Sequence, residues 1–71
     1  MQLTRHAKNQ ARWIGLTRFE IEQVIAEPIH IDRDEKGRPR YLGEVEGERI
    51  RVVVALDDPD VIVTVHPRRG R

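Results

Sequence analysis

Apolar and polar residues alternate most regularly in the last third of the chain. Residues 49–56 and 61–66 are rich in valine and isoleucine, and the polar stretch 57–60, Asp-Asp-Pro-Asp, separates them. β-Branched residues in alternation on both sides of a turn are typical of a β-hairpin. The pattern therefore predicts two antiparallel strands here, and they contain the most apolar part of the chain.

The turn at 58–59 predicts which residues of this hairpin lie opposite one another. On one face of the sheet the expected pairs are Val52 with Val65, Val54 with Val63, and Leu56 with Val61. On the other face they are Val53 with Thr64, Arg51 with His66, and Arg49 with Arg68. Because successive side chains of a strand point to opposite faces, one face is predicted to be aliphatic and the other polar and cationic.

The beginning of the chain shows helical spacing instead. Small and apolar residues recur every three or four positions along one stripe: Leu3, Ala7, Ala11 and Ile14. This spacing predicts a helix from residue 4 to about residue 14, followed by Gly15 at the position where a left-handed residue commonly ends a helix. Trp13 lies near the edge of the stripe, and we expect it in the core or at its margin.

A second helix is predicted shortly afterwards. Thr17 and Glu20 have the spacing of a capping box, so the helix should run from Arg18 to about Ala26, before a proline at position 28. We expect Phe19, like Trp13, in the core or at its margin. The outline is that of a helix-turn-helix, but the second helix is acidic, and DNA phosphates repel an acidic recognition helix.

Alternation returns after this helix and completes the sheet. Strands are predicted at 29–32 and 40–45, with a polar turn at 34–39 between them. Glu46-Gly47 marks a tight turn into the hairpin. Carried across this turn, the register pairs Glu44 with Arg49, Leu42 with Arg51, and Arg40 with Val53.

Length and composition limit what this domain can be. The 71 residues have room for a single domain and include no cysteine, which excludes disulfides and fits a reducing compartment. No apolar run approaches the roughly 20 residues of a membrane span, and no signal-peptide centre is visible. We therefore expect a cytoplasmic α+β domain with no membrane partner, in which two N-terminal helices pack on a four-stranded antiparallel meander sheet and residues 68–71 form a flexible basic tail.

Charge is distributed unevenly, although the formal net charge is only +1. Residues 1–18 contain four cations and no acid, residues 19–37 are mainly acidic, and three arginines follow Pro67. If the two basic ends meet in the fold, they form a surface suited to phosphate groups. Ordinary solvated surface charge is the alternative, and the sequence leaves both open.

The polar face of the predicted hairpin has the residue types that metal-independent RNA cleavage requires. A base takes the proton of the 2′-hydroxyl, an acid protonates the leaving oxygen, and cations stabilise the charged phosphorus centre. His66, and His6 from the first helix, can serve as acid or base near neutral pH. Arg49 and Arg51 can bind phosphate oxygens, and Thr64 can donate a hydrogen bond. Alternatively, the arginines only protect an exposed strand from aggregation.

The histidines do not indicate a metal site. His6, His30 and His66 include no close pair at the spacing of metal ligands, so we expect neither a bound metal nor another cofactor. His30 alternates with two isoleucines and is expected to face solvent. Tyr41 has two interpretations, stacking on a nucleic-acid base or packing beneath the second helix, and both remain open.

Several short segments together resemble a family of small bacterial and phage domains of unknown function, in the neighbourhood of the BrnT and RelE/ParE-like toxins. The segments are residues 3–7 with 12, 14–17, 24–25 with 28, 37–38, 51–54 and 62–67. The resemblance spans nearly the whole chain, and its more specific parts are His6-Ala7 and 63–65. The modest net charge departs from the strongly basic character of ribosome-dependent toxins.

This resemblance implies a RelE- or barnase-like fold and a metal-independent endoribonuclease of a toxin–antitoxin or effector system. RNA and a cognate antitoxin protein are the implied partners. The expected catalytic residues are His6, Arg12, Arg51, Thr64 and His66. The residues expected to contact RNA phosphates are Arg5, Lys8, Arg40, Arg49 and Arg68. The alternative function is that of a non-catalytic phage or plasmid module that binds a host protein.

One geometric condition applies to this set of residues. The helices cover the aliphatic face, so His6 reaches the polar face only if the first helix lies along an edge of the sheet. The strand at 61–66, the last of the predicted meander, is the natural edge.

Overall fold

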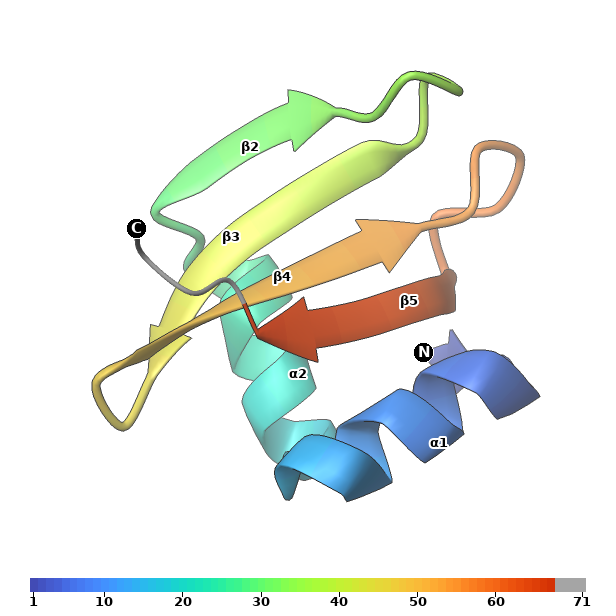
Figure 1. Cartoon of the computed structure of the whole chain (residues 1–71). Helices are drawn as coiled ribbons and strands as arrows, with labels where there is room; N and C mark the ends of the chain where they lie inside the picture. Colours follow the sequence, from blue (N-terminus) through green and yellow to red (C-terminus); the bar gives the residue numbers. More distant parts are fainter. Residues whose placement is uncertain (68–71) are drawn as a thin grey trace.

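The computed structural model describes residues 1–67, which form two helices and five strands (Figure 1). The elements in chain order are β1 (Gln2–Leu3), α1 (Arg5–Ile14), α2 (Arg18–Ala26), β2 (His30–Arg33), β3 (Pro39–Val45), β4 (Glu48–Val54) and β5 (Val61–Pro67). The strands form one sheet in the order β1-β5-β4-β3-β2. The α+β class is therefore confirmed, while the predicted tail, with Arg68, lies outside the described residues.

The sheet is mixed and has five strands, so the predicted four-stranded antiparallel meander was wrong in this respect. β1 pairs with β5 in parallel, with Gln2 opposite Val61, whereas β2, β3, β4 and β5 pair antiparallel. The backbone N–H of Thr4 continues the parallel pairing by donating to the Ile62 carbonyl at 3.0 Å. A strand of two residues is too short to show alternation, and this is why the sequence pattern missed it.

Local interactions define the helix ends, and those at Gly15 and at Thr17 with Glu20 were predicted. The side chain of Thr4 accepts a hydrogen bond from the Ala7 N–H at 3.1 Å, and Gly15 ends α1 in the left-handed conformation at φ 71°. Thr17 and Glu20 form the reciprocal capping box that opens α2. These caps satisfy N–H groups that have no partner within a helix, and so they stabilise the start of each helix.

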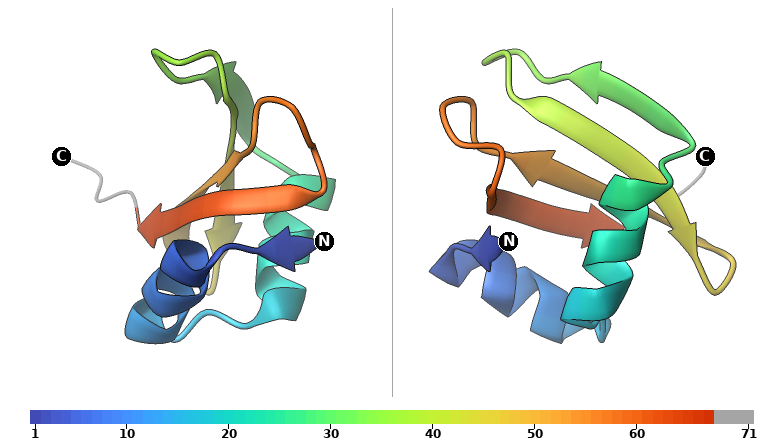
Figure 2. Two further views of the ribbon diagram at one scale, coloured as in Figure 1. Left: turned by 90° about the vertical axis from the view of Figure 1, so that its right-hand side faces the viewer. Right: turned by 180° about the vertical axis from the view of Figure 1, so that it is seen from behind.

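The helices occupy different places against the sheet. The helix α2 packs against β3 and β4 and stands in front of them in the right-hand view of Figure 2, while α1 runs along β5. The core between them consists of Ala7, Ala11, Ile21, Val24, Ile50, Val52, Val54, Ile62 and Val65. Gly43 of β3 permits the close approach of α2, because a Cβ there would lie 2.9 Å from Cγ1 of Val24. We call the side of β3, β4 and β5 that faces this core the covered face, and the other side the open face.

The predicted register is confirmed over most of the sheet. The observed pairs include Arg40 with Val53, Leu42 with Arg51, and Glu44 with Arg49. They also include Arg51 with His66, Val52 with Val65, and Val53 with Thr64. The open face therefore carries the polar residues that alternation assigned to it.

The register was wrong at the far end of the hairpin. An irregularity between Val53 and Val54 pairs Val54 with Ile62 instead of with Val63. Such a bulge exchanges the faces of the residues beyond it, so Ile62 is fully buried in the core. β4 ends at Val54, and Leu56, which was expected on the aliphatic face, is 61% exposed.

Trp13 and Phe19 were expected in the core or at its margin, and this was also wrong. Their exposed fractions are 88% and 67%. Ala7 and Ala11 take the inward positions of α1, and their small side chains bring the helix close to the sheet, which turns Trp13 outward. Tyr41, by contrast, packs against the core, as one of its two interpretations required.

Candidate functional site

The open face presents its side chains in rows that cross the strands. In the first row Asp32 lies beside Arg40, Arg40 beside Val53, and Val53 beside Thr64. Val53 is only 3% exposed. Polar groups in this row therefore surround an apolar floor.

A second row runs beside the first. It consists of His30, Leu42, Arg51 and His66, again in register from β2 to β5. Leu42 is 6% exposed, whereas the His30 side chain is 63% exposed, in agreement with its expected place in solvent. The two rows together put one imidazole, that of His66, at the β5 end beside Arg51.

A pocket of about 360 Å³ lies over these rows and under the turn between β2 and β3. Its lining residues are Asp34, Glu35, Lys36, Arg38, Arg40, Arg51, Val53, Thr64 and His66. The pocket thus brings together four of the residues expected in the site: Arg40, Arg51, Thr64 and His66. Lys36 and Arg38 add two cations that the sequence pattern indicated only as part of a polar turn.

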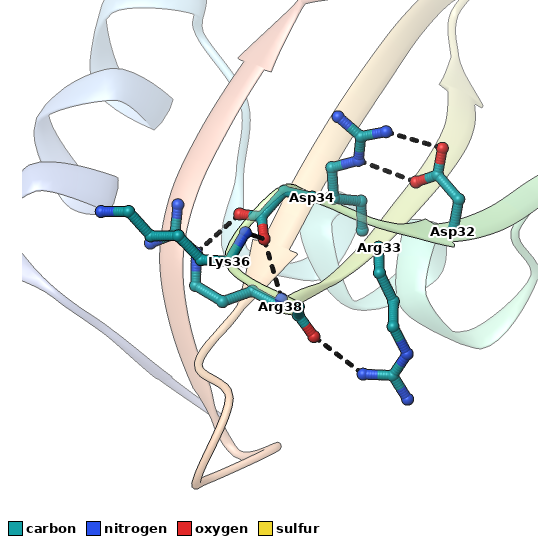
Figure 3. Close-up of polar contacts among 7 residues, drawn as sticks. Asp32, Arg33, Asp34, Lys36 and Arg38 are labelled. Carbon is teal, nitrogen blue, oxygen red and sulfur yellow. Dashed lines mark hydrogen bonds and ion pairs between the residues drawn. The ribbon is translucent and has the colours of Figure 1, made fainter.

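Arg40 is held in position by a carboxylate on the neighbouring strand. Its Nε and Nη2 donate to the two oxygens of Asp32 at 2.8 and 2.7 Å (Figure 3). The hydrogen bond from Arg40 lowers the pKa of the Asp32 carboxyl, and the same contact raises the pKa of Arg40. A two-pronged pair of this kind fixes the plane of the guanidinium.

The turn between β2 and β3 is built around Asp34. One carboxylate oxygen accepts the N–H groups of Lys36 and Arg38 at 2.9 and 2.8 Å, and the other accepts Nε of Arg38 at 2.7 Å (Figure 3). Burial acts to raise the pKa of Asp34, but these hydrogen bonds outweigh it and the pKa is lowered. Gly37 completes the turn with φ 83°. The signal in the sequence was Asp followed three residues later by Gly, a common turn spacing that here also positions two cations.

His66 has the properties of a base at neutral pH. Its partial burial lowers the pKa of the imidazole, and the positive charges of Arg51 and Arg40 lower it further. A hydrogen bond with the backbone of Pro67 acts in the opposite direction without reversing the shift. A histidine with a pKa below its ordinary value near 6.5 is neutral at pH 7 and can accept a proton.

Gln10 connects α1 to the pocket-bearing strand. Its Oε1 accepts hydrogen bonds from the Thr64 hydroxyl and the Val65 N–H, both at 2.8 Å. Thr64 therefore directs its proton at Gln10, which leaves the lone pairs of its oxygen to accept a further hydrogen bond. These bonds hold α1 along the edge of the sheet at β5, where the sequence analysis required it for His6.

The helix residues expected in the site do not join the pocket. His6 lies one turn before Gln10 on the same side of α1, and it is exposed and not among the residues that line the pocket. Lys8 and Arg12 lie on the other side of α1, where they line a groove of about 300 Å³ together with Arg18. Arg5 is exposed at the first position of the same helix.

Arg49 lies on the open face beyond the pocket, opposite Glu44. Within residues 1–67, no three histidine or carboxylate side chains gather in a way that could hold a metal ion. Neither of the described helices has the length and apolar character needed to cross a bilayer.

Comparison with known proteins identifies the family of the chain. Residues 3–67 match a family described as a domain of unknown function, DUF4258. The match agrees with the small domain of unknown function expected from the sequence, and it shows no link to BrnT or RelE. Neither the curated proteins nor the solved structures contain a significant match. Because the match covers nearly all of the described chain, the protein belongs to the DUF4258 family.

Proposed function

We propose that the pocket on the open face binds the backbone of RNA and cleaves it by attack of the 2′-hydroxyl, without a metal ion. The observation that carries this proposal is the position of His66, a histidine with a lowered pKa that shares one pocket with Arg51, Arg40 and Lys36. A neutral base surrounded by cations suits a substrate whose nucleophile must lose a proton and whose phosphate carries negative charge.

The residues of the pocket have separate roles in this reaction. His66 accepts the proton of the 2′-hydroxyl while the 2′-oxygen forms a bond to phosphorus. Arg40, fixed by Asp32, and Arg51 stabilise the additional charge on the phosphate oxygens. The bond to the 5′-oxygen breaks, and this oxygen takes a proton from the ammonium group of Lys36, which releases one more readily than a guanidinium does. The products are a 2′,3′-cyclic phosphate and a free 5′-hydroxyl.

The biological setting that we propose is a toxin–antitoxin or effector system, with a cognate antitoxin as the protein partner. Support for it comes from the short segments that resemble BrnT and RelE/ParE-like toxins. The catalytic proposal does not depend on this setting, because it rests on the pocket.

The test is cleavage of single-stranded RNA in excess EDTA, with detection of 2′,3′-cyclic phosphate ends. We expect His66→Gln to lower the rate about 10²- to 10⁴-fold, the range for loss of a general acid or base. His30→Gln is the matched control, because His30 belongs to the same row of the open face but does not line the pocket. We also expect His6→Gln to retain activity. The proposal fails if the wild-type protein does not cleave RNA, or if His66→Gln cleaves as fast as His30→Gln.

A second candidate function, a non-catalytic module that binds a host protein, is favoured by the exposure of Phe19 and Leu56, at 67% and 61%. The two candidates differ in bacteria that produce the protein. If the protein is a ribonuclease, the His66→Gln variant should no longer affect growth. If it is a binding module, the His66→Gln variant should still affect growth, and the Phe19→Ala variant should not.

A further inference from the structure

We propose that Trp13 is a stacking platform for a nucleobase of single-stranded RNA, beside the pocket that contains His66. This inference rests on the proposed function for the identity of the ligand. Trp13 is 88% exposed, whereas tryptophan is on average a highly buried residue. An indole in solvent offers a flat surface of the kind on which unpaired bases stack.

The position of Trp13 along β5 follows from the contacts of α1. The helix and the strand run side by side in the same direction (Figure 1). Just before the helix begins, the Thr4 N–H donates to the carbonyl of Ile62. Six residues later, the side chain of Gln10 accepts a hydrogen bond from the Val65 N–H. Six helical residues advance about 9 Å and three strand residues about 10 Å, so the two elements stay in step. Trp13, a further 4.5 Å or so along the helix, is then level with His66.

The side of α1 on which Trp13 lies is also determined. Residues three apart in a helix share a side, so Trp13 lies on the side of Gln10. The Gln10 side chain reaches Thr64, which lines the pocket from the open face. Trp13 therefore stands at the border of the open face, next to the end of β5 that carries the proposed base.

The chemistry around Trp13 suits a nucleic acid better than an apolar protein surface. Its neighbours on the same side of α1 are polar, namely His6, Asn9 and Gln10. The helix has no acid that would repel a phosphate, although its cations Lys8 and Arg12 lie on the other side and do not surround Trp13. The nearby pocket supplies cations for the phosphates on either side of a stacked base. A base stacked on Trp13 belongs to a nucleotide next to the phosphate in the pocket, and it contributes affinity with little preference for sequence.

Because the chain contains a single tryptophan, its fluorescence reports on this site alone. The probe is a short single-stranded oligonucleotide with 2′-O-methyl groups throughout, which binds as RNA does but cannot be cleaved. We expect it to quench the fluorescence of the wild-type protein. An abasic oligonucleotide of the same length and charge should quench much less, since it has phosphates but no base to stack.

Affinity provides the second measurement, by fluorescence anisotropy of the labelled oligonucleotide at fixed salt. We expect Trp13→Ala to weaken binding roughly 10- to 100-fold, and Trp13→Phe to restore most of it. The control is Phe19→Ala, which removes another exposed aromatic residue and should leave affinity unchanged. Trp13→Ala should keep the thermal stability of the wild type because the indole buries little surface.

These outcomes separate this inference from the proposed function. Base-dependent quenching by a protein that does not cleave RNA supports the stacking site and overturns the catalytic proposal. Cleavage with an affinity that Trp13→Ala does not change overturns the stacking site alone and leaves Trp13 for a protein partner. The stacking site is also overturned if the abasic oligonucleotide quenches the fluorescence of Trp13 as strongly as the oligonucleotide with bases.

Discussion

The two faces of the central strands differ less in burial than in what surrounds the buried residues. On the covered face, Ile50, Val52 and Val54 pack against the helices and are at most 3% exposed. On the open face, Val53 is equally buried, but it lines the pocket among charged side chains. The covered face therefore provides stability, while the open face combines an apolar floor with charged side chains.

The largest effect should come from a cavity on the covered face. Ile62 is fully buried, and we expect Ile62→Ala to lower the free energy of unfolding by about 2–5 kcal/mol. In a domain of this size, that is a large part of the total stability. The measurement is urea denaturation. Ile31→Ala serves as the control at a side chain that is 54% exposed, and its effect should stay within about 0.5 kcal/mol. Equal losses for the two variants would contradict the role given to the covered face.

A hydroxyl group placed on each face in turn tests whether the two faces differ in their access to polar partners. Val52 and Val53 are neighbours in the chain, 0% and 3% exposed, on opposite faces of the sheet. Val52→Thr puts a hydroxyl against the helices with no partner, which should cost about 1–3 kcal/mol. Val53→Thr puts the same group beside a polar pocket, where it finds partners, and should cost less than about 1 kcal/mol. If urea denaturation shows that both substitutions lower the free energy of unfolding equally, the environment of Val53 offers a hydroxyl no more hydrogen-bond partners than the core does.

Most of this division between faces was predictable from the sequence, for a physical reason. Once the turn at 46–47 sets the register, alternation assigns each residue of β3 and β4 to a face, so the pairing of Arg51 with Leu42 followed directly. The bulge at Val54 was not predictable in this way. It lies where Thr4 bonds to the backbone of Ile62, and residues 58 positions away in the chain give no local signal.

The candidate site was predictable to the same extent. Alternation gathered Arg40, Arg51, Thr64 and His66, since they lie on strands of known register. It gave no information on Lys36 and Arg38, because the Asp34 turn places them over the face through side-chain hydrogen bonds. Helical spacing grouped Trp13 with the core or its margin. Whether a residue at the edge of an apolar stripe is buried depends on how closely the helix approaches the sheet.

The contact between α1 and the open face offers a smaller test. Gln10→Ala removes the acceptor of both the Thr64 hydroxyl and the Val65 N–H, and we expect a loss of about 1 kcal/mol. Hydrogen exchange of the Val65 amide should accelerate in this variant, which distinguishes a lost hydrogen bond from a general loss of packing. Asn9→Ala, at an exposed neighbouring position of α1, should change neither quantity. An unchanged exchange rate of the Val65 amide in Gln10→Ala would contradict the role of Gln10 in holding α1 against β5.

The smallest effect concerns the pH dependence of stability, and it tests the open face at His66. The folded state lowers the pKa of this imidazole through partial burial and through Arg51 and Arg40, whereas in the unfolded chain the pKa stays near 6.5. Between these two values the unfolded chain binds more protons than the folded one, so the free energy of unfolding falls as pH decreases through that window. Above 6.5 the contribution of His66 is constant. Asp32 and Asp34 act only near and below their ordinary value of 3.8.

We therefore expect the wild-type protein to lose a fraction of a kcal/mol between pH 7.5 and pH 5, measured by urea denaturation at each pH. His66→Gln should remove this part of the slope, and His30→Gln, at an exposed position in the same row, should keep it. A pKa of His66 above 6.5, determined by NMR titration, would contradict the electrostatic picture of the pocket. Because the proposed base must be neutral to accept a proton, the acidic limb of RNA cleavage should follow the same pKa. Stability and activity then report on one imidazole by independent measurements.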